Sequence, residues 1–200
     1  MCLRSLCWIS AALALAGCGS SPSARYYTLG AVAAPASAQA DAPSIVVGPI
    51  GLPEAVDRLQ IVRRIDGTRS EPADGHRWAG SLKAEMGRRL AAALASERGL
   101  ARVVAVPQSS IARPDYTLPI DVLRFDADGF ERVTLDAVWT LRRDGRDIAS
   151  RRFTASETIG AATYEALAAT YEALAATHGR LIDALARDVA QSVPAVTPAR

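Results

Sequence analysis

Residues 116–125 read Tyr-Thr-Leu-Pro-Ile-Asp-Val-Leu-Arg-Phe, and residues 133–141 read Val-Thr-Leu-Asp-Ala-Val-Trp-Thr-Leu. In both runs apolar side chains alternate with polar ones, the period of a strand that buries one face. The tight-turn dipeptides Asp128-Gly129 and Asp144-Gly145 follow the two runs, and a third run spans about Asp147 to Thr154. The sequence therefore predicts a three-stranded antiparallel meander. Pro119 cannot donate to a ladder, which predicts an edge position or a bulge for the first strand.

Shorter apolar runs and two longer periodic stretches flank the meander. Residues 45–50, 59–65 and 102–106 are predicted strands, and the polar residues 69–76 are a predicted loop. Residues 77–97 lack proline and place apolar side chains four apart, which predicts a helix that ends at Gly99. A second helix is predicted from about Ala161 to Gln191. Its apolar row consists of Tyr164, Leu167, Tyr171, Leu174, Leu181 and Leu185.

The second predicted helix contains a literal repeat. Ala162 to Ala168 and Ala169 to Ala175 both read Ala-Thr-Tyr-Glu-Ala-Leu-Ala. A duplicated heptad lengthens a helix by ~10 Å and turns its face by only ~20°, so the apolar row keeps its side. We interpret the repeat as a tolerated duplication; the alternative is an extended arm for self-association or partner docking.

Composition and these elements together predict one α+β domain. The chain has 200 residues, 50% apolar and 22% charged, with a net charge of +2, which is typical of a globular protein and argues against a nucleic-acid-binding face. We predict a mostly antiparallel sheet covered by two long helices, over residues 44–192. Residues 18–43 are a predicted flexible tether with one short extended piece at residues 25–29, and residues 193–200 a predicted disordered tail.

The N-terminus resembles a bacterial lipoprotein signal. One basic residue precedes an apolar run that is too short to span a bilayer, and the run ends in Leu15-Ala16-Gly17-Cys18, which is similar to a lipobox. The resemblance implies that residues 1–17 are removed as a signal peptide and that Cys18 is the lipid attachment residue. The alternative is a plain signal peptide followed by an incidental cysteine.

Lipidation of Cys18 would decide the chemistry of all three cysteines. Cleavage discards Cys2 and Cys7 and acyl chains occupy Cys18, so the mature chain would carry no free thiol and no thiolate metal ligand. Two or three acyl chains hold a protein stably to a membrane. Gly19 follows the cysteine where an aspartate would favour retention in the inner membrane, so we expect an outer-membrane anchor.

No constellation of catalytic, cofactor-binding or metal-binding residues stands out. The sequence lacks a Gly-x-Ser-x-Gly elbow, a P-loop and a His-Glu-x-x-His motif. The two histidines, His76 and His178, are isolated. The carboxylates of the meander are interpreted as solvated strand faces, and so are the arginine pairs 63–64, 88–89, 142–143 and 151–152. These carboxylates are Asp121, Asp126, Asp128, Glu131 and Asp136.

The mature chain resembles, in order, the ABC-type transport auxiliary lipoproteins, the family of PqiC-like intermembrane transport lipoproteins. The resemblance begins at the lipobox and covers nearly the whole mature chain; only the duplicated heptad departs from it. The matching stretches are residues 26–29, 46–54, 57–58, 60–64, 77–79, 115–118, 122–125 and 135–139.

This resemblance implies an accessory subunit of a lipid-transport machine, with no catalytic residue and no cofactor. Its partners would be a tunnel protein with MCE (mammalian cell entry) domains and inner-membrane ABC or PqiA-like components. The lipoprotein would dock the tunnel on the periplasmic side of the outer membrane and support envelope integrity; a ring-forming homo-oligomer is a further option. The alternatives are an outer-membrane lipoprotein that activates a cell-wall synthase and, less favoured, a lipid-modified hydrolase.

Overall fold

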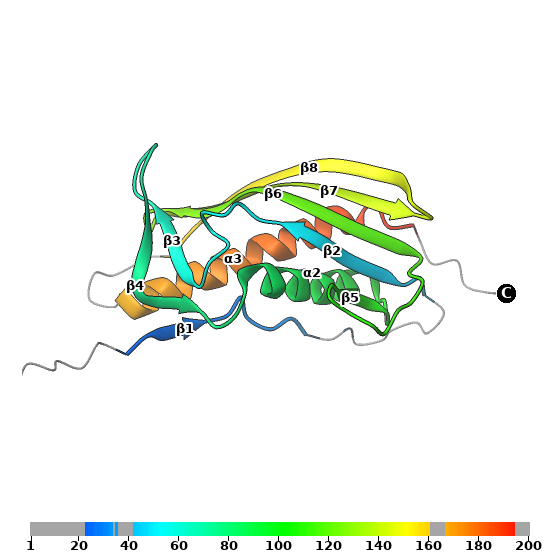
Figure 1. The fold of residues 1–200 in the computed structure, drawn as a ribbon, viewed down its shortest axis with the longest axis horizontal. Helices are drawn as coiled ribbons and strands as arrows, with labels where there is room; N and C mark the ends of the chain where they lie inside the picture. Colours follow the sequence, from blue (N-terminus) through cyan, green and yellow to red (C-terminus); the bar gives the residue numbers. More distant parts are fainter. Residues whose placement is uncertain (1–22, 34, 36–41, 161–166, 195–200) are drawn as a thin grey trace, which may run out of the picture.

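Eight strands and two helices make up the part of the chain that the structure describes (Figure 1). The structure is a computed structural model, and it describes residues 23–33, 35, 42–160 and 167–194. The helices are α2 (Leu82–Arg98) and α3 (Leu167–Ala190). The strands are β1 (Arg25–Tyr27), β2 (Ile45–Gly51), β3 (Gln60–Arg64), β4 (Ser70–Trp78), β5 (Val103–Ala105), β6 (Tyr116–Asp128), β7 (Arg132–Arg143) and β8 (Arg146–Thr158).

All eight strands belong to one mixed sheet. β6, β7 and β8 form the predicted antiparallel meander, whereas β2 pairs with β6 and β5 in parallel, and β3 pairs with β6 in parallel. β2 and β3 occupy successive stretches along one side of β6, and β7 occupies its other side. The α+β class and the single domain are thus confirmed. Alternation predicted which face of β6 and of β7 is buried, but it carries no information about the direction of the neighbouring strand.

Pro119 lies in the middle of the sheet. β6 has neighbours on both sides, so the predicted edge position is wrong, but the predicted irregularity is present. Neither ladder registers Pro119, and the β2–β6 register shifts between Val47 and Ile50 opposite it. The missing N–H therefore falls where no ladder hydrogen bond is required.

The first helix starts later than its periodicity predicts. Residues 70–78, predicted as a loop and a helix start, form β4, and Trp78 donates its backbone N–H to the carbonyl of Leu59 at 2.7 Å. The Ser81 side chain then accepts from the N–H of Ala84 and caps α2, which ends at Gly99 with φ of 62°. Because β4 is largely exposed to solvent, most of its residues are polar. The polar composition is the reason why these residues were predicted to form a loop.

Both helices cover one face of the sheet, and the core lies between (Figure 1). α3 packs on β7 and β8, α2 packs on β2 and β5, and the two helices contact each other. The predicted rows are buried in both helices wherever side chains are described; Tyr164 and the side chain of Leu167 lie outside that description. The buried rows are Leu82, Met86, Leu90 and Leu94 in α2, and Tyr171, Leu174, Leu181 and Leu185 in α3.

Part of the predicted tether belongs to the folded domain. β1 pairs in parallel with β4, and the N–H of Ala79 donates to the carbonyl of Tyr27 at 2.7 Å. Tyr27 and Leu29 are buried, and Leu29 is only 1% exposed. At the other end, Val193 of the predicted tail is also buried. The folded domain therefore extends beyond the predicted residues 44–192. Sequence periodicity could not predict this, because Tyr27, Leu29 and Val193 are isolated apolar residues in polar stretches.

Candidate functional site

A groove of about 720 Å³ separates the N-terminal segment from α3. One wall is formed by residues 25–31, and the other by Glu172, Ala175, Ala176 and Arg180, with Arg89 of α2 also in the lining. Glu172 and Ala175 of the second heptad copy, and Ala176 directly after it, thus border the groove. The segment that the sequence assigned to a tether supplies half of this site.

Arg89 fixes the N-terminal segment to both helices. Its Nε donates to the Gly179 carbonyl and to Asp183, both at 2.9 Å, and its Nη1 donates to the carbonyl of Leu29. The side chain is 11% exposed, so these charge-assisted bonds are largely screened from water. Gly179 is required here, because a Cβ would meet the Leu29 carbonyl oxygen and lie 2.9 Å from Arg89 Cζ.

The charges around the groove are largely paired. Arg89 bonds Asp183, and Arg180 bonds Glu157 and the Thr177 hydroxyl. The remaining lining charges are Glu172 and Arg25. The groove therefore has no concentration of charges of one sign.

His76 joins β1 and β4 to α3 through an aromatic cluster. Its Nδ1 lies 2.7 Å from the Tyr27 hydroxyl, and its ring stacks on Tyr171 at 3.8 Å. Phe130 meets Tyr171 edge-on, and the Arg63 guanidinium lies 4.2 Å from the Phe130 ring centre. Burial, together with nearby Arg25 and Arg63, lowers the pKa of His76. Neutral His76 thus acts as a packing and hydrogen-bonding group.

His178 is a core residue. Its ring contacts Trp78 and Phe125, and its Nδ1 lies 2.9 Å from the Leu174 carbonyl, a suitable acceptor for an Nδ1–H. Burial lowers the pKa of His178 to about 4. His178, which stands where a further copy of the heptad would place tyrosine, therefore fills a neutral core position.

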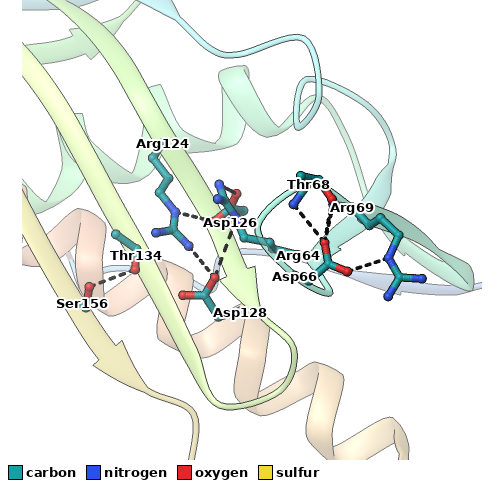
Figure 2. Close-up of polar contacts among 9 residues, drawn as sticks. All are labelled: Arg64, Asp66, Thr68, Arg69, Arg124, Asp126, Asp128, Thr134 and Ser156. Atoms are coloured by element: carbon teal, nitrogen blue, oxygen red, sulfur yellow. Dashed lines mark hydrogen bonds and ion pairs between the residues drawn. The ribbon is translucent and has the colours of Figure 1, made fainter.

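Two carboxylates of the meander form an ion-pair network instead of a solvated face (Figure 2). Asp126 accepts from Arg124 Nε at 2.7 Å and from Arg64 Nη2 at 3.0 Å, and Asp128 accepts from Arg124 Nη2 at 2.6 Å. Asp126 is only 8% exposed. The prediction that Asp126 lies on a solvated strand face is therefore wrong, because the parallel pairing of β3 with β6 brings Arg64 alongside Asp126.

Other predicted surface charges divide into paired and solvated groups. Asp136 accepts from Arg152 at 2.6 Å and from Thr154, and these hydrogen bonds, with the Arg152 bond as the largest cause, lower the pKa of Asp136. Asp121 and Glu131 are exposed, as expected of solvated strand ends.

Within the described ranges, no group of three or more potential metal ligands occurs, and no helix is long and apolar enough to cross a membrane. Cys18 lies outside the described residues.

The fold is shared with solved structures. An uncharacterized protein matches with a TM-score of 0.66 and 17% identity, covering 86% of this chain and 99% of the other. A Xanthomonas campestris protein described as DUF330 matches with a TM-score of 0.65 and 22% identity, covering 84% of this chain and 96% of the other. At these identities the likeness defines the fold alone: an α+β domain with a mixed sheet over two helices.

A family model fits residues 27–190 and is described as the ABC-type transport auxiliary lipoprotein component. The chain belongs to this family, which is not a known enzyme family, and the resemblance seen in the sequence is confirmed. Among proteins of curated function, none matches the chain.

Proposed function

We propose that this chain is a lipid-anchored accessory subunit of an intermembrane lipid transport system. Acylated Cys18 would hold it on the periplasmic side of the outer membrane, where it would dock an MCE-domain tunnel fed by inner-membrane transporter components. The observation that carries the proposal is the family match, which runs from Tyr27 in β1 to Ala190 at the end of α3. It therefore covers nearly the whole folded core.

The docked N-terminal segment favours this role over the alternative of a cell-wall synthase activator. A free tether from Cys18 to Ser44 would reach about 90 Å when fully extended. With β1 held on β4, only the residues between Cys18 and Arg25 remain as a lead, which extends to about 24 Å at most. Such a lead keeps the domain close to its membrane, which suits a docking platform better than a reach through the cell wall.

Capture of crosslinked partners tests the proposed function. Mature lipoprotein recovered from crosslinked envelopes should bring down an MCE-domain protein. A Cys18→Ser chain provides the matched control, since it should remain unprocessed or detach from the membrane. Recovery of a cell-wall synthase instead would establish the alternative, and a Cys18→Ser chain at mature size in the membrane fraction would refute the lipid anchor.

A further inference from the structure

β8 is a long strand at the margin of the sheet (Figure 1). It runs over 13 residues, Arg146–Thr158, and within the described part of the chain its only ladder partner is β7. Half of its backbone N–H and C=O groups therefore point away from the sheet, which makes the strand a template for pairing with another chain. Edge strands usually prevent such pairing by being short or by carrying proline, lysine or a bulge. β8 contains neither proline nor lysine, and its one unpaired residue, Ile148, lies near its start.

The helix-facing row of β8 carries two charges that already contact α3. This row lies opposite buried residues of β7 and consists of Arg151, Phe153, Ala155 and Glu157. Glu157 accepts a hydrogen bond from Arg180, and Arg151 Nη1 lies 3.9 Å from Asp188 Oδ1. The Arg151 side chain is nevertheless 51% exposed. An additional carboxylate from outside the chain can therefore reach Arg151.

A second copy of β8 supplies that carboxylate. In an antiparallel pair centred on Thr154, Arg151 of one copy stands directly opposite Glu157 of the other, because residue 154 is midway between them. Two-fold symmetry repeats this contact. Since Asp188 lies beside Arg151 and Arg180 beside Glu157, charges of alternating sign would then cross the interface twice. Opposite charges that face each other across an antiparallel ladder are stabilising.

The charge pattern selects this register. A two-fold pair must be centred on a residue, because the helix-facing row of one copy has to meet the same row of the other. A centre one residue away, at Phe153 or Ala155, removes the contact between Arg151 and Glu157. A centre at Arg152 places this arginine opposite itself, which is destabilising. The pair centred on Thr154 covers residues 150–158 and leaves the irregular start of β8 outside.

The same arrangement brings the two α3 helices together. α3 packs on β7 and β8, so both copies of α3 would lie on one face of the joined sheet. Contacts of Arg180 and Asp188 with β8 define the side of α3 that would face its symmetry mate. Ala173 and Ala184 belong to this side, since they are spaced three to seven residues from Arg180 along one helix row. Both are only half-buried, and their small side chains allow a second helix to approach.

We propose that two copies of this chain join through their β8 edges as an antiparallel pair centred on Thr154. The interface is isologous, so it closes at two copies and does not by itself build a ring. A two-fold rotation keeps each point at the same height along its axis, so the leads from both Cys18 residues would start at equal height above one membrane. The pairing rests on the folded domain and not on the proposed transport role.

Cysteine crosslinking of the full-length chain in intact envelopes tests the register. Thr154→Cys places two thiols at the axis, where opposite Cβ atoms lie about 4.5–5.5 Å apart, close to the span of a disulfide. Ser150→Cys is the matched control, because Ser150 is exposed on the same face of the same strand but would lie about 27 Å from its symmetry mate. Mild oxidation should link most of the Thr154→Cys chain into dimers and leave Ser150→Cys at the background of the parent chain. Equal yields in the two variants would overturn the proposal.

A second cysteine and a charge at the axis complete the test. Adding Thr158→Cys to Ser150→Cys should restore the crosslink, because residues 150 and 158 stand opposite each other in this register. Mature protein in detergent should have the mass of two copies by light scattering. Thr154→Lys, which opposes two ammonium groups, should raise the dissociation constant about fivefold or more, whereas Ser150→Lys should change it little. A mass of one copy, or equal effects of the two lysines, would overturn the proposal.

The outcomes separate this inference from the proposed function. A Thr154→Lys chain that no longer dimerises but still captures an MCE-domain protein would support the β8 pair and leave the transport role intact. A dimer with the expected crosslinks that captures no MCE-domain protein would support the pair and refute the transport role. A mass of more than two copies that Thr154→Lys does not reduce would refute the pair alone.

Discussion

Replacement of Leu29 by alanine tests whether the N-terminal segment is part of the domain. Leu29 is 1% exposed, and its carbonyl accepts from Arg89. Leu29→Ala removes three buried carbons, about 2.4 kcal/mol at ~0.8 kcal/mol per methylene, and leaves a cavity that adds to this. Since the segment lies at the sheet margin and can partly collapse, we expect a loss of about 2–3 kcal/mol in unfolding free energy.

Urea and thermal denaturation of a chain that starts at Gly19 measure this loss. For a domain of this size, about 2–3 kcal/mol corresponds to a fall of roughly 5–10 °C in Tm. Tyr26→Ala is the matched control, because Tyr26 is a neighbour on the same strand and its side chain is exposed. The control should change the unfolding free energy by less than about 0.5 kcal/mol.

A Leu29→Ala effect as small as that of Tyr26→Ala would refute the reasoning. Residues 25–31 would then behave as the flexible tether that their composition suggests. The lead from Cys18 would then be long, and it would not hold the domain close to the membrane.

Three further changes probe the packing of α3. Gly179→Ala would gain about 1 kcal/mol in an isolated helix, but here the methyl group meets the Leu29 carbonyl, and denaturation should show a loss of about 1–3 kcal/mol; a gain would contradict the close packing. His178 has a pKa of about 4 in the fold and about 6.5 when unfolded, so the unfolded state takes up the proton first and stability falls by about 3 kcal/mol as pH drops from 6.5 to 4. His178→Leu should lose much of this pH slope in urea titrations, and an unchanged slope would refute the assignment. Deletion of Ala169 to Ala175 leaves an identical heptad next to Ala176, so the core residues are restored and Tm should change little; a collapse of Tm would show that both copies are structural.

Local patterns predicted the elements whose signal is contained in a short window. Alternation identified β6, β7 and β8, and a four-residue period identified α2 and α3 with the correct buried rows. The same patterns misplaced β4, since its residues are mostly exposed and polar and its backbone is held by pairing with β3. Of the residues considered as sites, His178 and Asp126 proved to be buried because of partners distant in sequence.

By itself the sequence determined the meander and the two helices, because each rests on spacing within one stretch of chain, and the family resemblance rests on a series of short stretches in order. Tertiary structure alone decided that β1 docks on β4 and that Arg89 of α2 hydrogen-bonds the Leu29 carbonyl. These contacts join residues that are tens of positions apart in the sequence. Their favourable free energy comes from burial and hydrogen bonds that form only when the sheet packs against the helices. The length of the lead from Cys18, and with it the proposed approach to the membrane, follows from those contacts.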